Sequence, residues 1–528
     1  IEGSAGATVN YTVSDGVNTS GGSTTIGPNG MTGLLLDLSG FNDGVITVSA
    51  TQTIGGAAKS LGTGRTGKSS IVPGAPVLSL AQYISPTNMA AYAIRITGAP
   101  GTFAIFGIAD ARGLQNADSD IIPTSGVLDE TLDASWSLDG PIAVLSALYN
   151  GNGNSAATVV GVTKDTVAPV LQPSTQPYVN LGNAGDYQPL LIGEPGASAA
   201  YTITDGSTTL SDSKPMNASG KWQPSITLTS LKDGPLTLTV TETDPAGNTT
   251  VVVVNLVKDT SAPTGTFSVA ASLINGVLAT SNPTLALTLS FADKGTGMAA
   301  MALSADGGTT FGTPSNYATT ASLTLAADGI SVVMVAVADV AGNVSAVSRS
   351  VRLDRSGPSV GYSITAPSNA GSYDVGQKVA LSFTASDVDN VATVSATLDG
   401  STSIAGGSTF NTEALTAGNH SIVISARDAL GNTSTTTIAF AVHATADGLA
   451  TAVSDGASRR LITSSNVASQ LQSYISSAQK AIQSGKNAQA KTYLASLVAL
   501  VQQQSGKTIS SAYAALLVGW ANDLIGRL

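Results

Sequence analysis

The sequence predicts a mostly β protein in which antiparallel β-sandwiches follow one another in an elongated array and a small three-helix domain ends the chain. Three observations predict this architecture. A segment of about 94 residues recurs along the chain. Its strands are short and alternate between apolar and polar residues. From about residue 460 the apolar residues recur with a helical period instead.

Length and composition limit the classes of protein and partner. A chain of 528 residues is longer than one hydrophobic core usually supports, so several domains of roughly 100 residues are expected. The net charge of −11 argues against nucleic acid and anionic membranes, which attract basic proteins, and favours cations as partners. The absence of cysteine excludes disulfides, thiolate metal sites and a cysteine nucleophile. No apolar run approaches the length of a membrane span, so no membrane insertion is expected.

A linker motif marks the boundaries between repeats. It reads Lys-Asp-Thr-Val-Ala-Pro at 164–169 and recurs in related form at 258–263 and 353–358, with a degenerate Gly-Ala-Pro at 74–76. These boundaries predict a first repeat without its first strand at 1–75, a divergent second repeat at 76–168, and further repeats at 169–262, 263–357 and 358–443, before a linker and helical module at 444–528.

A second motif sets the register of one strand in each repeat. In the third repeat Gly234 opens a strand, and ten residues later Asp244 opens the next turn. The second, fourth and fifth repeats keep this spacing, and the residues between alternate as in a half-buried strand. The closing turn, Asp-Pro-Ala-Gly-Asn at 244–248, has the residues that hairpin loops favour. Short strands with turns at this spacing predict Ig-like sandwiches.

The combination of the Asp-x-x-Gly-Asn turn with the Asp-Thr-x-Ala-Pro linker resembles the bacterial Ig-like repeats of large surface adhesins, over roughly residues 1–443. The first repeat departs from the pattern, because Ile54-Gly-Gly-Ala-Ala58 stands where the acidic turn is expected. The resemblance implies an extracellular, cell-surface protein.

The C-terminal residues have a helical pattern. Residues 466–482, 488–503 and 511–525 are the predicted helices, with Gly485 and Gly506 as stops and Ser464, Ser465 and Ser510 as candidate N-caps. The runs 482–490 and 501–510, with Leu494, are similar to the FIMAH module found at the ends of secreted bacterial enzymes and surface proteins. That resemblance covers about 70 residues and implies an extracellular location but no chemistry.

Motifs that would indicate an enzyme fail in context. The run Gly62-Thr-Gly-Arg-Thr-Gly-Lys-Ser69 matches a P-loop pattern, but Pro73 and Pro76 forbid the helix that a P-loop must open. Only two histidines exist, and His420 takes an inward strand position, which favours a satisfied core or rim histidine over a catalytic one. No catalytic residue is therefore assigned, and the protein is not expected to be an enzyme.

Recurring acidic and amide residues predict calcium at the repeat junctions. In an Ig topology the loop between the last two strands lies at the pole where the chain enters, so its Asp and the linker Asp should converge. Calcium takes six to eight oxygen ligands. The candidate ligands are Asp165, Asp244, Asn248 and Glu194 for the third repeat, Asp259, Asp293, Asp339 and Asn343 for the fourth, and Asp354, Asp387, Asp389, Asp428 and Asn432 for the fifth.

The competing interpretation is that these residues only form Asx turns and solvated caps. The second repeat has no linker Asp and carries Asn150 in its closing turn, so no ion is expected there and its joint should bend more easily.

These features predict the stalk and terminal region of a secreted bacterial adhesin or biofilm-matrix protein, stiffened by calcium. Five sandwiches of ~35–45 Å each would span on the order of 200 Å. One alternative is the protomer of a surface filament or layer, assembled by strand addition to the incomplete first repeat. Another is a set of accessory modules of a large extracellular hydrolase. The divergent second repeat, with its aromatic residues, is where a ligand would be sought; the ligand itself is unknown.

Overall fold

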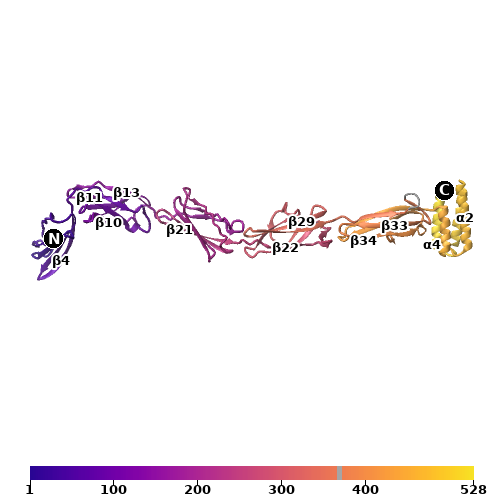
Figure 1. Cartoon of the computed structure of the whole chain (residues 1–528), viewed down its shortest axis with the longest axis horizontal. Helices are drawn as coiled ribbons and strands as arrows, with labels where there is room; N and C mark the ends of the chain where they lie inside the picture. The colour runs from indigo at the N-terminus through magenta and orange to yellow at the C-terminus, as the bar shows by residue number, and fades with distance from the viewer. Residues whose placement is uncertain (366–370) are drawn as a thin grey trace. The chain divides into compact units, whose positions relative to one another are not determined.

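The computed structural model describes residues 1–365 and 371–528. The chain forms two compact parts, Ile1–Ser261 and Ala262–Leu528. Antiparallel sheets dominate both parts, and four helices close the second, so the predicted mostly β fold with a small helical C-terminal domain is confirmed (Figure 1).

The third repeat has two facing sheets around one core. The three-stranded sheet has the order β14 (Gln172–Ser174), β16 (Leu190–Ile192), β19 (Lys221–Trp222). The five-stranded sheet has the order β15 (Tyr178–Val179), β21 (Thr249–Lys258), β20 (Gly234–Thr243), β17 (Ser198–Thr204), β18 (Thr209–Pro215). Only the short β15 pairs in parallel, with β21. The predicted inward residues of β20, Leu236, Leu238 and Val240, are buried in the core.

The second repeat repeats this plan with longer strands. Its three-stranded sheet has the order β10 (Val127–Leu132), β7 (Tyr92–Thr97), β5 (Val77–Leu80). A 3-10 helix, η1 (Met89–Ala91), precedes β7. The other sheet has the order β6 (Tyr83–Ile84), β13 (Thr158–Lys164), β11 (Gly140–Asn150), β8 (Phe103–Asp110), β9 (Gly113–Ile121), with β12 (Gly153–Asn154) paired to β11.

The first repeat forms one sheet in the described residues, in the order β2 (Thr19–Thr25), β1 (Thr8–Ser14), β3 (Gly44–Ile54), β4 (Ala57–Lys68). Its core is small, with two clusters of three buried residues each. The P-loop-like run lies on β4 up to Lys68, mostly exposed, and no helix follows it. The strand-to-helix context that a P-loop requires is therefore missing at this run.

The fourth and fifth repeats lie in the second part of the chain, and each has two sheets. In the fourth the orders are β22 (Thr264–Val269), β25 (Thr284–Ala292), β28 (Thr320–Thr324), and β23 (Ser272–Ile274), β24 (Val277–Thr280), β30 (Val344–Leu353), β29 (Gly329–Asp339), β26 (Met298–Ser304), β27 (Ser315–Asn316). In the fifth they are β31 (Ser359–Ile364), β33 (Lys378–Ser386), β36 (Ser408–Asn411), and β32 (Ser372–Asp374), β38 (Thr433–His443), β37 (Gly418–Asp428), β34 (Val391–Leu398), β35 (Thr402–Ile404).

Backbone conformation explains why a glycine opens the central strand of each repeat. Its φ is positive in all five repeats, and a side chain is strained in that region. The residues are Gly44, Gly140, Gly234, Gly329 and Gly418, with φ from 118° to 145°. In the first four repeats an Asp precedes this glycine and accepts hydrogen bonds from the following linker, as Asp233 does from Thr260 N at 3.0 Å. The linker motif and the Asp-Gly motif that opens the central strand are thus joined by hydrogen bonds.

The helical module has one helix more than predicted. Helices α2 (Ser465–Gln483), α3 (Asn487–Gln504) and α4 (Ser511–Arg527) match the three expected, and Ser464 caps α2 by accepting from Val467 N at 3.3 Å. The predicted linker instead contains α1 (Ala446–Ser458). Its two glycines, weak helix formers, hid it from a propensity argument, and packing of its apolar face supplies what propensity does not. Of the helices described, none is long and apolar enough to cross a membrane.

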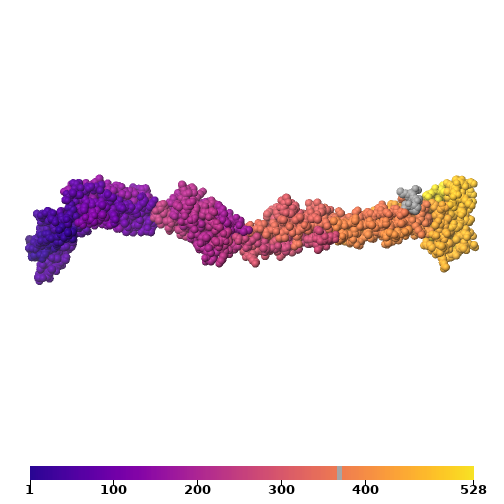
Figure 2. All heavy atoms as spheres, viewed as in Figure 1, coloured from indigo at the N-terminus to yellow at the C-terminus, as the bar shows by residue number. Residues whose placement is uncertain are grey.

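One hydrophobic core runs from the fifth repeat into the helices. It contains Phe440 and Val442 of β38 together with Leu449 of α1 and Trp520 of α4. Trp520 Nε1 donates across the boundary to the carbonyl oxygen of Leu415 at 2.9 Å. In Figure 2 the spheres of the fifth repeat and of the helices are in direct contact. The helical module is therefore packed onto the fifth repeat.

Candidate metal centres at the repeat junctions

The closing turn has the same internal geometry in three repeats. In the third, Asp244 Oδ1 accepts from Asn248 N at 2.9 Å, and Asn248 Nδ2 donates to Asp244 Oδ2 at 2.8 Å. The pairs Asp339–Asn343 and Asp428–Asn432 repeat both bonds at 2.7–2.8 Å. All three Asp side chains are buried. The turn thus holds a carboxylate in a fixed place.

The Asn of this turn also binds the incoming linker. Asn248 Nδ2 donates to the carbonyl oxygen of Asp165 at 3.0 Å, and Asn432 Nδ2 donates to that of Asp354 at 2.9 Å. Because the amide NH₂ serves the linker and the Asp, its carbonyl oxygen is the atom that faces any further ligand. The structure therefore places linker and closing turn side by side, as an Ig topology requires.

The acidic residues of the fifth repeat form a compact cluster. Asp354, Asp387 and Asp389 each offer a carboxylate oxygen, and these oxygens lie within 4.8 Å of one another. Asp389 is fully buried, and its Oδ2 has no hydrogen-bond partner among the described residues. Burial, followed by the charges of Asp387 and Asp389, raises the pKa of Asp354. The guanidinium of Arg352 contacts Asp389 from the side of the linker.

In the fourth repeat, Asp293 and Asp339 offer oxygens within 4.8 Å of each other. Asp293 Oδ2 accepts from Gly295 N at 2.9 Å and Gly297 N at 2.8 Å, while the buried Oδ1 has no partner among the residues described. Asp259, the third predicted acid, lies in the first part of the chain, where it is buried and accepts from Ser261 N at 3.1 Å. Its convergence with the other two stays a prediction.

The third repeat contains an acid that the sequence analysis missed. Glu242 is fully buried; its Oε1 accepts from Glu194 N at 2.6 Å, and its Oε2 has no partner in the described part of the chain. Burial raises the pKa of Glu242, and the charges of Glu194 and Asp244 raise it further. Burial, then Asp244 and Asp165, raise the pKa of Glu194 in the same way.

A cavity of about 360 Å³ lies beside these acids, lined by Asp165, Glu194, Gly193 and the linker 167–170. Gly193 is required there, because a Cβ at that position would lie 2.2 Å from Glu242 Oε1. The sequence signal that could have identified Glu242 as a buried acid is its inward position in β20. The inward positions of that strand are apolar up to Val240, and the corresponding positions in the fourth and fifth repeats are Val337 and Ala426.

The junction of the first and second repeats uses direct hydrogen bonds. Asn150 Nδ2 donates to Ile71 O at 2.7 Å, and Asn152 Nδ2 donates to Ser69 O at 3.1 Å. Asn150 thus binds the linker as Asn248 does. It stands at the position that Asp244 has in the third repeat, so this junction has an amide where the third repeat has a carboxylate.

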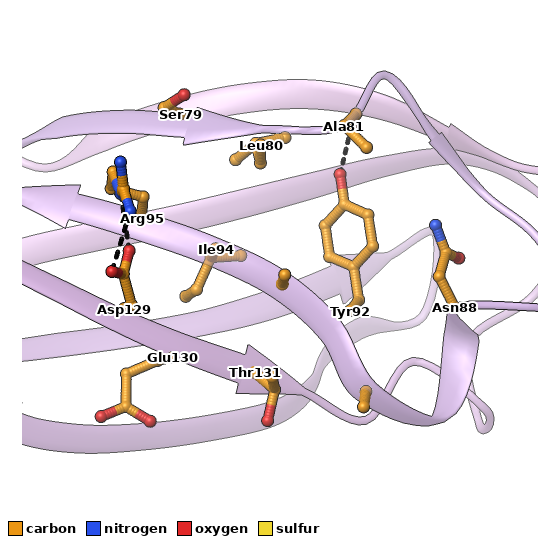
Figure 3. A pocket seen from close by; sticks show the side chains of 12 residues that line it. Ser79, Leu80, Ala81, Asn88, Tyr92, Ile94, Arg95, Asp129, Glu130 and Thr131 are labelled. Carbon is orange, nitrogen blue, oxygen red and sulfur yellow. Dashed lines mark hydrogen bonds and ion pairs between the residues drawn. The ribbon is translucent and has the colours of Figure 1, made fainter.

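A hollow on the second repeat shows why its polar residues do not indicate a ligand. The cavity, of about 680 Å³, lies over β5, β7 and β10 (Figure 3). Arg95 is paired with both oxygens of Asp129, at 2.6 and 2.9 Å. Tyr92 donates its hydroxyl to the carbonyl oxygen of Ala81. Arg95, Asp129 and Tyr92 of this lining are therefore already paired within the protein.

The histidine prediction is confirmed by geometry. His420 is 9% exposed, with Nδ1 2.7 Å from Asp399 Oδ2 and Nε2 2.8 Å from Thr416 O, and its ring stacks on Phe440. Both ring nitrogens are engaged, so this histidine is a satisfied structural residue. His443 Nδ1 lies 3.8 Å from Asp523 Oδ1.

Comparison with solved structures finds segments of large adhesion proteins. One is a tetra-tandem repeat in the extending region of a large adhesion protein, 18% identical over 67% of this chain and 94% of that chain, with a TM-score of 0.22. Another is the Ca²⁺-stabilised adhesin with which an Antarctic bacterium binds ice, 19% identical over 72% and 100%, TM-score 0.29. A 1.5-MDa bacterial ice-binding adhesin is 17% identical over 53% and 99%, TM-score 0.28. At these values the likenesses carry no argument about what this chain binds.

Sequence comparison is specific at the helical end. No curated protein matches the chain significantly. The model of the FIMAH domain, however, matches residues 446–526, which begin with α1 and end within α4. The four-helix module that packs onto the fifth repeat is therefore a FIMAH domain.

Proposed function

We propose that this chain is a segment of an extracellular adhesive stalk whose repeat junctions bind calcium. The observation that carries the proposal is the same in each of three repeats. A buried carboxylate oxygen lies beside other carboxylates and has no hydrogen-bond partner among the residues that the structure describes: Glu242 Oε2, Asp293 Oδ1 and Asp389 Oδ2. The stalk role rests on the tandem sandwiches and on their resemblance to adhesin repeats.

The physical argument is one of charge balance. Carboxylates within 4.8 Å of one another repel, and an unpaired buried carboxylate is costly. A divalent cation with oxygen ligands removes both costs, and calcium tolerates irregular sets of carboxylate, amide and carbonyl oxygens. In the fifth repeat Asp354, Asp387 and Asp389 would be the carboxylate ligands, with Asp428 and Asn432 holding the linker in place.

The direct test is thermal unfolding of the full chain in calcium and in chelator, together with calcium titration by calorimetry. An ion bound only by the folded junctions raises the midpoint by mass action. We expect a rise of several degrees in millimolar calcium. The double variant Asp387→Asn, Asp389→Asn should lose one class of sites, and Asp212→Asn, an exposed strand residue, should lose none.

Equal midpoints in calcium and chelator, with no heat of binding, would reduce these residues to turn formers. The chain would then be a string of sandwiches joined by hydrogen bonds alone.

A second candidate, self-assembly by strand addition, is favoured by the first repeat. Its sheet ends at the long, mostly exposed strand β4, and Leu35 is fully exposed beside half-buried Leu34 and Leu36. Unpaired strand edges next to apolar residues invite a further strand. Sedimentation velocity over a range of concentrations tests this; a single monomeric species throughout would rule it out.

A further inference from the structure

The boundary between the fifth repeat and the FIMAH domain encloses a carboxyl group that no candidate calcium centre uses. Glu413 lies in the 3-10 helix η2 (Thr412–Ala414) and is 2% exposed. Neither of its side-chain oxygens has a hydrogen-bond partner among the described residues. Arg459 Nη1, at the end of α1, lies 3.6 Å from Glu413 Oε2, beyond ordinary hydrogen-bond length.

Titratable groups face Glu413 from two helices. Asp455 and Arg459 come from α1 and its C-cap, and Tyr513 comes from α4. The turn between β32 and β33 contributes Gly376, which lies beside Oε1 and carries no charge. Two acids thus meet one cation, so the cluster carries a net negative charge when both acids are ionised, with Glu413 buried, Asp455 half-buried and Arg459 exposed.

We propose that Glu413 and Asp455 share one proton and that this proton locks the FIMAH domain onto the fifth repeat. A protonated carboxyl can donate to the other carboxylate, which supplies the hydrogen bond that Glu413 lacks. The pair then carries one negative charge, which Arg459 balances. Without the proton, two negative charges face each other in an apolar boundary.

The titration of Glu413 agrees with this geometry. Burial raises the pKa of Glu413 to about 7, Asp455 adds to the rise, and Arg459 opposes it. The ordinary pKa of a glutamate carboxyl is 4.5. Stability from the proton is therefore fully present below about pH 4.5 and is lost as the pH rises to about 7. The docking constant should fall by up to about tenfold per pH unit in that window.

The hydrogen bond of Trp520 and the shared core connect Glu413 to both α1 and α4, so the effect of its proton should be confined to this boundary. Trp520 and Tyr513 pack edge to face, with ring centroids 6.0 Å apart, and Tyr513 donates to Ala452 O at 2.5 Å. Loss of the proton should therefore loosen α1 and α4 together, while the first four repeats, which lie away from this boundary, keep their protection.

The test is hydrogen exchange of the full chain from pH 5 to pH 8, corrected for intrinsic exchange and run in both calcium and chelator. Wild-type protection of residues 446–458 and 511–527 should fall with pH in both media. Glu413→Gln, which is neutral at every pH, should keep its protection at pH 8. Glu130→Gln, the same change at a half-buried glutamate of the second repeat, should behave as wild type.

Asp455→Asn provides a second variant if Glu413→Gln folds poorly. It removes the facing charge, so the fall in protection should shrink and move to lower pH. Wild-type protection that is constant across this range, or a Glu413→Gln profile with the wild-type pH dependence, would overturn the proposal. Because the readout is the same in chelator, its failure is separate from a failure of the calcium proposal.

Discussion

The backbone N–H of Ala444 donates to Asp523 Oδ2 of α4 at 2.8 Å. In the third repeat the corresponding linker N–H, that of Thr260, is held by Asp233, which lies 27 residues before it. The fifth repeat has Ala417 at that position and lacks the carboxylate. The FIMAH domain therefore supplies, from α4, the carboxylate that accepts from the linker N–H. In the third repeat this carboxylate belongs to the repeat itself.

We predict that Asp523→Ala weakens docking of the FIMAH domain. It removes a charge-assisted hydrogen bond worth about 1.5–3 kcal/mol and also the ion pair of Asp523 with Arg527 at 2.8 Å, which leaves Arg527 only its hydrogen bond to Ala444 O. Urea unfolding followed by Trp520 fluorescence, with the other two tryptophans replaced by phenylalanine, measures the loss. Adding Ala417→Asp should restore part of it, because the repeat then has its own acceptor. An unchanged midpoint for Asp523→Ala would show that the bond contributes nothing.

A second prediction concerns Arg352, whose guanidinium contacts the buried Asp389. Arg352 pairs with Ile330 across the sheet of the fourth repeat. The corresponding pair in the third repeat is Val257 with Pro235, so a neutral residue stands there in place of the arginine. Arg352→Val should therefore raise the calcium affinity of the fifth repeat by about tenfold, because a competing cation is removed. It should also lower stability in chelator, where the carboxylates are left unbalanced.

Calorimetric titration of Arg352→Val against wild type measures this change. Arg349→Lys is the matched control, since Arg349 binds Phe267 O at 2.7 Å, away from the acidic cluster. An affinity equal to that of wild type would mean that Arg352 leaves the carboxylates free.

The repeat period and the strand register were predictable because they are backbone properties. Gly234 and Asp244 mark the ends of β20, and both do so through local turn chemistry that a sequence displays directly. The Asp-Asn pairing within the closing turn is equally local. By contrast, the contact of Arg352 with Asp389 joins residues 37 positions apart in two repeats, and no periodic pattern encodes it.

Glu242 is the site residue that the sequence analysis left out, and the reason is instructive. Strand alternation from Leu236, Leu238 and Val240 places residue 242 on the inward face, where the structure buries it, but an acidic residue is not expected there. A single acid at an apolar position is itself the signal of a buried charge that needs a partner. Helix α1 was missed for the opposite reason. Its glycines argue against a helix, and its packing against α2 and α4 in the shared core explains why it forms.

A third prediction follows from Glu242. Glu242→Gln keeps an oxygen for Glu194 N but removes the charge, so in chelator the third repeat should be more stable by about 1–3 kcal/mol. In calcium the gain should disappear, because the ion loses a carboxylate ligand. Thermal unfolding in the two media gives both numbers, and Glu130→Gln serves as the control outside this junction. A loss of stability in chelator would indicate that the carboxylate charge is already balanced.

The last prediction tests the strand-opening turn without any ion. Gly234 has φ +132°, and a Cβ built there meets nothing within 4 Å. Gly234→Ala should therefore destabilise the third repeat through backbone strain alone, by about 1–3 kcal/mol. Gly185→Ala in the same repeat also meets nothing within 4 Å, but its φ lies outside the strained region, so it should be neutral or slightly stabilising. Urea unfolding of both variants in chelator compares them. Equal effects would mean that the glycine is kept for a reason other than its conformation, whereas a loss confined to Gly234→Ala would show that the turn before β20 needs a residue that adopts this positive φ without strain.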